Sequence, residues 1–441
     1  MVVVFVLVAL GVVAAFAGLQ WYAWRRVVRD TTAPRGRARR AGTVVFVAGP
    51  LLMVAAFVSG RAGAPFPVQQ VLAWPGYMWL AISIYLVLAL LAGEFVRPVL
   101  RRLLARRDAA APGAAQAAVV PEAEPEPVAE PVTVGGADGA RGGAEGAGPA
   151  RGGATVPETG PGEGEPAPSR RLFVSRIVGG AAATAALATV GYGTYGVLRG
   201  PQVKAVTVPL AKLPRGAHGF RIAVVSDIHL GPILGRGHTQ RIVDAINGAQ
   251  PDLVAVVGDL VDGSVADLGV AAEPLAQLRA RHGSFFVTGN HEYFSGAEQW
   301  IDHVRELGLR PLQNERVEIA GFDLAGVNDV QGESEGQGPD FGRALGDRDP
   351  ARASVLLAHQ PVVIHDAVRH GVGLQLSGHT HGGQMWPGNI IAGLANPTLA
   401  GLEQYGDTQL YVTRGAGAWG PPVRVGAESD ITVVTLASKQ A

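Results

Sequence analysis

The sequence predicts two different halves: membrane-spanning helices in the first 200 residues and a layered α/β domain in the rest. Long uncharged apolar stretches occupy much of the first hundred residues, whereas short β-branched runs alternate with amphipathic stretches from Gly219 onward. Residues 1–200 carry 19 basic and 12 acidic side chains and residues 201–441 carry 18 and 25, so the net charge of zero is +7 cancelled by −7. A chain of 441 residues is expected to contain more than one folded unit.

Three uncharged stretches predict a three-helix transmembrane region over residues 1–107. They cover Val2–Trp24, Gly42–Gly60 and about Ala73–Gly93, and each is close to the ~20 residues that cross a bilayer core. The second stretch contains Pro50, which a packed membrane helix tolerates.

Residues 169–200 are predicted to form either a fourth transmembrane helix or a twin-arginine-like anchor. The apolar part, Ile177–Leu198, is rich in Ala and Gly. The preceding sequence Ser169-Arg170-Arg171-Leu172-Phe173-Val174 resembles the twin-arginine export motif of bacteria. The same arginines also suit the cytoplasmic flank of an ordinary membrane helix. Both interpretations place the following residues outside.

The arginines predict the orientation in a bacterial-type cell membrane. They gather in residues 25–40, 97–107 and 170–176, whereas Arg61 alone lies between the second and third stretches. Because positive charges favour the cytoplasmic side, we expect four crossings and an extracytoplasmic domain from about residue 200 onward. If the fourth stretch does not insert, the C-terminal half is cytoplasmic.

Residues 108–168 are predicted to be a disordered linker. The tract is rich in Pro, Ala, Gly and Glu, as in PEAEPEPVAEPV, and shows no apolar periodicity.

The composition of the whole chain also excludes some functions. The absence of Cys excludes disulfides, thiolate zinc sites and cysteine nucleophiles, and the balanced charge indicates no nucleic-acid-binding face.

In residues 201–441, polar side chains stand immediately after buried strands. The predicted strands are 220–227, 253–259, 284–290, 354–360, 372–381, 408–415 and 430–436, with a helix that includes residues 241–248. The first five are followed by or end in groups with metal-binding chemistry: Asp227 and His229, Asp259, Asn290 with His291 and Glu292, His359, and His379 with His381. Because ligands converge beyond the carboxyl ends of strands in open sheets, we expect these groups to meet.

The ordered set DxH, GD, GNHE, H and GHTH, within residues 219–437, resembles the calcineurin-like metallophosphoesterase superfamily. GDLVDG (258–263), GHTHGGQ (378–384) and TRGAGAWGPPVRVG (413–426) resemble its bacterial membrane-anchored phosphodiesterase branch. The resemblance implies an α/β fold, the four-layer α-β-β-α metallophosphoesterase sandwich, and a metal-dependent phosphoric ester hydrolase.

The resemblance also implies roles for individual residues. Two divalent metal ions, Mn, Fe or Zn, would lie roughly 3.5–4 Å apart and share the hydroxide that attacks phosphorus. The first would be held by Asp227, His229 and His381, the second by Asn290, His359 and His379, and Asp259 would bridge them. His291 would protonate the leaving oxygen or serve as a hydrogen-bonding neighbour. Asp262 and Glu292 are candidates for orienting imidazoles or are loop residues, and Arg414 would reach a phosphate or is a surface arginine.

We therefore expect a membrane-anchored phosphoesterase acting on phosphodiester, phosphomonoester or pyrophosphate bonds of a phosphorylated small molecule or an envelope or lipid-linked phosphate. Two alternatives remain from the sequence. One is a cytoplasm-facing enzyme that resembles UDP-diacylglucosamine pyrophosphohydrolase and acts on a glycolipid. The other is a non-enzymatic membrane sensor that retains the metal site.

Overall fold

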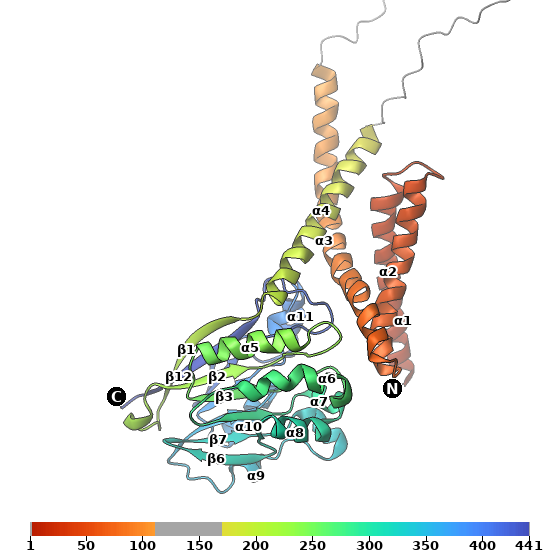
Figure 1. Ribbon diagram of the computed structural model, residues 1–441. Helices are drawn as coiled ribbons and strands as arrows, with labels where there is room; N and C mark the ends of the chain where they lie inside the picture. Colours follow the sequence, from red (N-terminus) through yellow and green to blue (C-terminus); the bar gives the residue numbers. More distant parts are fainter. Residues whose placement is uncertain (1, 111–169, 441) are drawn as a thin grey trace, which may run out of the picture.

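The computed structural model describes residues 2–110 and 170–440, with an N-terminal helical part followed by an α/β sandwich (Figure 1). The predicted linker, residues 108–168, lies outside the described residues from residue 111 onward.

Four long helices form the N-terminal part, in agreement with the four apolar stretches. They are α1 (Val2–Trp24), continued by a π-helical segment (Arg25–Arg29), α2 (Arg37–Arg61), α3 (Phe66–Ala110) and α4 (Arg170–Leu198). Among the described residues, Arg37–Arg61, Phe66–Arg107 and Arg170–Leu198 are long and apolar enough to cross a membrane. Helix α4 leads directly into the sandwich (Figure 1).

Helices α2 and α3 form a hairpin whose two arms touch at glycines. A Cβ atom added to Gly49 would lie 2.1 Å from the ring of Trp79, and one added to Gly76 would lie 2.5 Å from the carbonyl oxygen of Leu52. Only glycine allows such an approach of the two helices, so the two arms are in close contact where residues 49–56 face residues 76–79.

The first sheet of the sandwich has six strands and contains both ends of the domain. Its order is β1 (Gln202–Leu210), β12 (Asp430–Ser438), β2 (Phe220–Val225), β3 (Leu253–Val257), β4 (Ser284–Val287) and β5 (Leu309–Pro311). All neighbouring pairs are parallel except β12 with β2. Strands β2, β3 and β4 therefore end at the same edge.

The second sheet also has six strands, in the order β10 (Gly401–Tyr405), β11 (Thr408–Val412), β9 (Leu374–Ser377), β8 (Ala353–Leu357), β7 (Phe322–Gly326) and β6 (Glu315–Ile319). The central strands β7, β8, β9 and β11 run parallel, and the outer strands β6 and β10 pair antiparallel with their neighbours.

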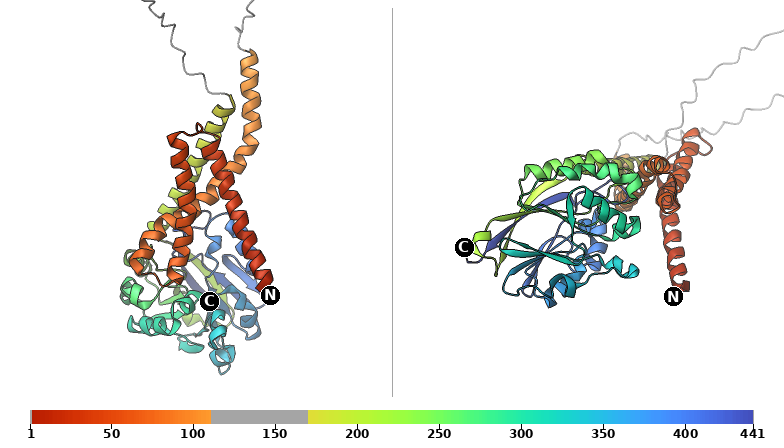
Figure 2. Two further views of the ribbon diagram at one scale, coloured as in Figure 1. Left: turned by 90° about the vertical axis from the view of Figure 1, so that its right-hand side faces the viewer. Right: turned by 60° about the horizontal axis from the view of Figure 1, so that its bottom comes forward.

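The two sheets and their helices make four layers, as the resemblance implied (Figures 1 and 2). Apolar side chains of both sheets, such as Val224, Leu324 and Leu357, fill the space between them. Helices α5 (Arg236–Gly248), α6 (Val265–Ala272) and α8 (Ala297–Glu306) cover the first sheet, and α9 (Phe341–Leu345) and α10 (Ile364–Arg369) cover the second. Two short helices, α7 (Asn290–Ser295) and α11 (Gly388–Ala395), lie in loops. Burial of this apolar surface is the main force that holds the layers together.

Five strands were not expected from the sequence: β1, β5, β6, β7 and β10. Strand β1 is exposed or half-buried at all its residues except Val208 and Leu210, and it is held in place by β12, more than 200 residues away. Strand β5 has only three residues. Such strands depend on pairing with distant partners, and their local sequence carries little signal.

Candidate metal centre

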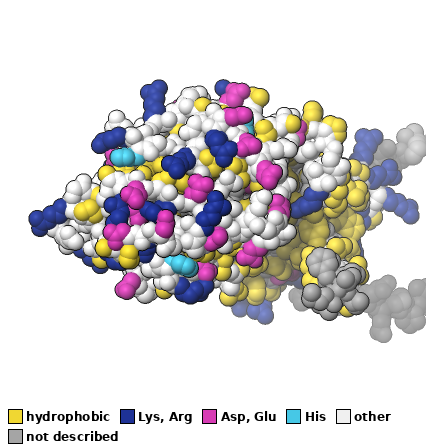
Figure 3. All heavy atoms as spheres, turned by 90° about the horizontal axis from the view of Figure 1, so that it is seen from below, with side chains coloured by type: hydrophobic (Ala, Val, Ile, Leu, Met, Phe, Trp, Pro, Cys, Tyr) yellow, Lys and Arg dark blue, Asp and Glu magenta, His cyan; other side chains and the backbone are white. Residues whose placement is uncertain are grey.

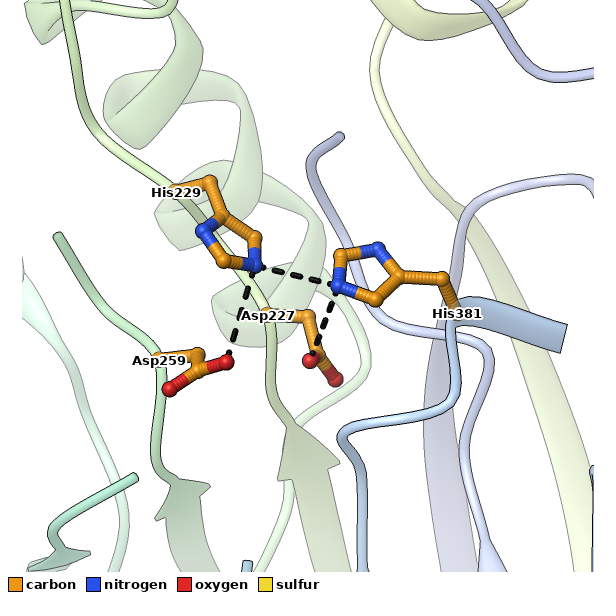
Figure 4. Close-up of side chains that lie close together, drawn as sticks. All are labelled: Asp227, His229, Asp259 and His381. Atoms are coloured by element: carbon orange, nitrogen blue, oxygen red, sulfur yellow. Dashed lines mark hydrogen bonds and ion pairs between the residues drawn. The ribbon is translucent and has the colours of Figure 1, made fainter. Parts of the chain in front are cut away.

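Loops from both sheets bring the predicted ligands to one edge of the sandwich. Strands β2, β3 and β4 of the first sheet lead to Asp227 with His229, to Asp259 and to Asn290, and strands β8 and β9 of the second sheet lead to His359, His379 and His381. The expected convergence beyond the strand ends therefore occurs, with the two sheets facing each other across the cluster. Figure 4 shows four of these side chains pointing toward one another.

The first group of candidate ligands consists of Asp227, His229, Asp259 and His381, whose ligand atoms all lie within 4.8 Å of one another. His229 Nε2 lies 3.1 Å from His381 Nε2 and 3.8 Å from Asp259 Oδ2, and His381 Nε2 lies 3.3 Å from Asp227 Oδ1 (Figure 4). Two ligand atoms on one ion at ~2.0–2.2 Å each have about this spacing. The group therefore fits a cation.

A second group shares Asp259 and adds His359 and His379. Asp259 Oδ2 lies 3.1 Å from His359 Nε2, and Asn290 Oδ1 lies 3.0 Å from His379 Nδ1. His359 Nδ1 is 2.9 Å from the carbonyl oxygen of Val257 and donates to it. The buried Nε2 of His359 is close to Asp259 Oδ2, but no contact among the described residues gives it a hydrogen bond of good geometry. Because Nδ1 carries the proton, Nε2 carries the lone pair, and this lone pair is available to bind a cation.

The two groups contain nitrogen and oxygen ligands without thiolate, which suits divalent cations such as Mn, Fe or Zn and does not select among them. The charges of the site agree with this chemistry. Burial by itself raises the pKa of the Asp259 carboxyl, but His359 and His229 hold it well below its usual range. Asp259 is therefore ionised, as a cation ligand must be.

The histidines differ in pKa. Burial lowers the pKa of His379 to about 4, with His359 adding to the effect, and burial with the charges of His229 and Arg424 lowers that of His381. For His229, burial acts in the same direction, but Asp262, Asp259 and Asp227 outweigh it and raise the pKa to about 9. Because imidazole binds metals only when neutral, a cation would displace the proton from His229.

Backbone strain is concentrated at the same residues. Nine described residues other than glycine have positive φ, and five of them are candidate ligands: Asp227, His229, Asp259, His379 and His381. This left-handed conformation is unfavourable for side chains with a Cβ and persists only where the surrounding structure imposes it. The strain indicates that the loops are shaped to aim these side chains.

Asp262 contacts both His229, a candidate metal ligand, and His291, the candidate proton donor. Its Oδ1 lies 3.0 Å from His229 Nδ1 and 2.7 Å from His291 Nδ1. Both Nδ1 atoms can donate to this oxygen, which leaves each Nε2 pointing away from it. One carboxylate therefore orients two imidazoles.

Glu292 was a candidate for orienting an imidazole, but its carboxylate binds backbone N–H groups instead. Its carboxylate accepts hydrogen bonds from the backbone N–H groups of Asp259 (2.9 Å), Leu260 (2.8 Å) and Gly289 (2.6 Å). It therefore ties the loop after β3 to the loop after β4. Burial, followed by the charge of Asp259, raises the pKa of Glu292 to about 7.

Arg414 is not placed within the ligand cluster. Its Nη1 lies 3.8 Å from Asp430 Oδ2, and its side chain is 39% exposed.

Two residues that the sequence did not single out support the ligands. Arg424 is buried and donates to the carbonyl oxygens of His381 (3.1 Å) and Gly417 (2.7 Å), with its Nη2 3.3 Å from His381 Nδ1. Ser226 donates from Oγ to Asp227 Oδ2 at 2.7 Å. The only sequence signal for Ser226 is its position before Asp227, and for Arg424 it is a charge between two valines.

The chain is similar to known proteins. The family model for the calcineurin-like phosphoesterase matches residues 220–383. "Transmembrane protein with metallophosphoesterase domain" of Danio rerio is 40% identical over 267 residues, 57% of this chain and 61% of that protein. A Helicobacter pylori protein named "Uncharacterized metallophosphoesterase" is 38% identical over 259 residues, 57% of this chain and 69% of that protein.

A Bacillus subtilis protein named "Uncharacterized metallophosphoesterase YkuE" is 31% identical over 289 residues, 61% of this chain and 98% of that protein. The matching part of the chain covers 61–62% of the length of the Danio rerio and Bos taurus relatives.

Proposed function

Because this chain belongs to the calcineurin-like phosphoesterase family, we propose that it is a membrane-anchored, metal-dependent phosphoesterase. It would hydrolyse phosphodiester, phosphomonoester or pyrophosphate bonds in envelope or lipid-linked phosphates. The observation that carries the proposal is the meeting of two ligand groups, one mainly from each sheet, at the shared carboxylate of Asp259.

In this proposal the cations number two. Asp227, His229 and His381 would hold one, Asn290, His359 and His379 would hold the other, and Asp259 lies within reach of both groups. When bound, such cations supply Lewis-acid stabilisation of phosphate charge and make water more acidic. The donor set contains the carboxylate, imidazole and amide groups that this chemistry requires.

His291 is proposed to be the proton donor to the leaving oxygen. Its Nδ1 is 2.7 Å from Asp262 Oδ1, and its side chain is 17% exposed. With Nδ1–H donating to Asp262, Nε2 is the ring atom left to give a proton to the leaving oxygen. Its backbone N–H donates to Asp259 Oδ1 at 2.9 Å, which fixes the ring beside the ligand cluster. A positioned acid of this kind contributes ~10²–10⁴-fold to rate.

We propose that residues 1–107 and 169–200 span the membrane, that 108–168 link them, and that 201–441 form the catalytic domain outside the cytoplasm. The 61–66 turn and the end of α4 lie toward the domain, whereas the arginine-rich ends of α2, α3 and α4 lie at the opposite end of the bundle (Figure 1). This separation agrees with positive charges on the cytoplasmic side.

The surface next to α4 also suits a bilayer. Helix α11 exposes Ile390 (58%), Ile391 (74%) and Leu394 (86%). Trp386, two residues before this helix, donates its backbone N–H to the carbonyl oxygen of Val425, which packs against α4. In contrast, both signs of charge are mixed over the face seen from below, and apolar side chains cover the helices beside it (Figure 3). Apolar side chains on a short surface helix favour contact with the lipid interface.

Hydrolysis by the purified full chain tests the enzymatic proposal. With Mn²⁺, we expect release of product from an aryl phosphodiester and from a lipid-linked phosphodiester. Asp259→Ala and His291→Ala should each lower kcat by at least about a hundredfold. Asp302→Ala, which removes a surface carboxylate of α8, is the matched control. Full activity in either of the first two variants would refute the proposed site.

The orientation has its own test. Reporter fusions to the C-terminus that are active only on one side of the membrane should report the extracytoplasmic side. A cytoplasmic signal would reject the proposed topology while leaving the hydrolysis result intact.

A further inference from the structure

A cleft of about 750 Å³ separates the metal centre from the hairpin of α2 and α3. The hairpin, residues 37–110, lines one side with Phe57, Arg61 and Tyr77, and the sandwich lines the other with His291 and Trp419. Figure 2 shows the lower ends of these helices beside the domain. The membrane part of the chain is therefore a wall of the space in front of the site.

Aromatic rings connect this wall to the candidate acid. The ring centroids of Tyr77 and Phe57 are 5.0 Å apart, those of Phe57 and Trp419 are 6.5 Å apart, and those of Trp419 and His291 are 5.8 Å apart. Trp419 is 46% exposed, so much of its ring faces open space. The rings offer apolar surface from the membrane helices to the place where phosphate chemistry would occur.

Arg61 supplies positive charge in the same cleft. It is the only Lys or Arg among the residues that line this cleft. Its Nη1 donates to the carbonyl oxygen of Phe57 at 3.3 Å, and no carboxylate within the described parts of the chain forms an ion pair with it. The guanidinium therefore retains donors for an anionic oxygen, for which its planar fork is well suited.

The wall is held in place by close packing. The glycine contacts at Gly49 and Gly76 fix α2 against α3. The sandwich is in turn fixed to α4, where a Cβ added to Gly193 would lie 2.7 Å from Val423 and 2.8 Å from the carbonyl oxygen of Arg424. Arg424 also contacts His381, so the bundle and the ligand loops share one packed region.

We infer that the hairpin is part of the substrate site and that the substrate is an amphiphilic, lipid-linked phosphoester. The phosphate lies at the metal centre, the apolar chain lies along Phe57 and Trp419, and Arg61 pairs with an anionic oxygen of the head group. This inference rests on the proposed function and narrows its substrate class. It also gives the second and third membrane segments a role beyond anchoring.

The kinetic test compares two substrates on the full chain in lipid nanodiscs. One is a soluble aryl phosphodiester, and the other is an aryl phosphodiester that carries a long acyl chain. Arg61→Gln should lower kcat/KM for the acylated substrate at least about tenfold more than for the soluble one, mainly through KM, because a charge-assisted hydrogen bond is lost. Arg61→Lys should recover part of the loss, and Phe57→Ala should act in the same direction.

Arg40→Gln is the matched control, because Arg40 is exposed at the far end of the same helix. It should leave both substrates unaffected. Equal losses on both substrates in Arg61→Gln, or no loss on either, would overturn the inference and leave the proposed function standing.

A second measurement does not depend on hydrolysis. A lipid phosphodiester that carries a diazirine near its head group should label peptides containing Phe57 or Trp419, and an excess of unlabelled lipid phosphodiester should suppress this labelling. Arg61→Gln should reduce it. If the wild-type chain hydrolyses neither substrate, the proposed function fails, while the labelling still decides the lipid site. Labelling that misses both peptides, or that resists competition, would overturn the inference.

Discussion

Asp262 offers the sharpest test of how the site is organised, because one of its oxygens holds two imidazoles. Asp262 Oδ1 lies 3.0 Å from His229 Nδ1 and 2.7 Å from His291 Nδ1. Burial alone would raise the pKa of Asp262, but His229 and His291 hold it far below its usual range, so the carboxylate is charged. The Asp262→Asn substitution keeps the size and shape of the side chain but removes its negative charge.

The expected size of the effect follows from those two contacts. A hydrogen bond to a charged group is worth ~1.5–3 kcal/mol and a neutral one ~1 kcal/mol, so each imidazole loses about 0.5–2 kcal/mol of the interaction that holds its ring in place. For His229 this corresponds to a loss of metal affinity of about twofold to thirtyfold. For His291 it should appear as a fall of kcat by about the same factor at saturating metal.

Metal affinity should be measured by titration calorimetry, and kcat should be measured with an aryl phosphodiester as the substrate. Asp302→Asn is the control, because its carboxylate contacts only Arg305 on the surface of α8 among the described residues. If Asp262→Asn binds metal and turns over within twofold of wild type, the assigned positioning role is wrong.

Three further predictions concern stability. Burial, followed by the charges of Arg241 and Arg424, lowers the pKa of His238 from 6.5 to about 4. The unfolded chain therefore binds this proton first, and stability should fall as pH drops from 6.5 toward 4, by up to roughly 1.4 kcal/mol per pH unit. His238→Leu should flatten that part of the Tm–pH curve, and an identical curve would contradict the assignment. In Gly378→Ala the new Cβ would lie 1.9 Å from Ser226 Oγ, so Tm and metal content should fall, at a cost of about 1–3 kcal/mol. Gly393→Ala, which has no atom within 4 Å of the new Cβ, should do neither. Chelation should lower Tm and added Mn²⁺ should restore it, because a ligand that binds the folded state stabilises it; a Tm indifferent to both would argue against cation binding.

Much of the site could be predicted because its signals are local. Asp259 follows five buried residues of β3, and His359 stands two residues beyond β8, so each lies beyond a strand that the sequence itself marks. The common edge then follows from parallel pairing. The helices α1 to α4 were visible for a similar reason, since an uncharged apolar stretch is a property of consecutive residues.

The roles of other residues depend on contacts between distant segments. His238 lies in α5, and its side chain is buried against the domain. Glu292 was a candidate for orienting an imidazole, but it accepts three backbone N–H groups from two loops. Arg424 acts on His381 from 43 residues away. None of these contacts leaves a periodic or spaced pattern along the chain.

The sequence by itself determined that apolar helices precede a layered α/β domain and that metal-binding groups follow its buried strands, because periodicity and strand ends depend on neighbouring residues. Only the tertiary structure decided that the two sheets face each other across Asp259, that Asp262 serves two histidines, and that the α2–α3 hairpin walls the cleft with Arg61. These features arise from the packing of segments far apart in the chain, whose relative position is set by burial of shared apolar surface.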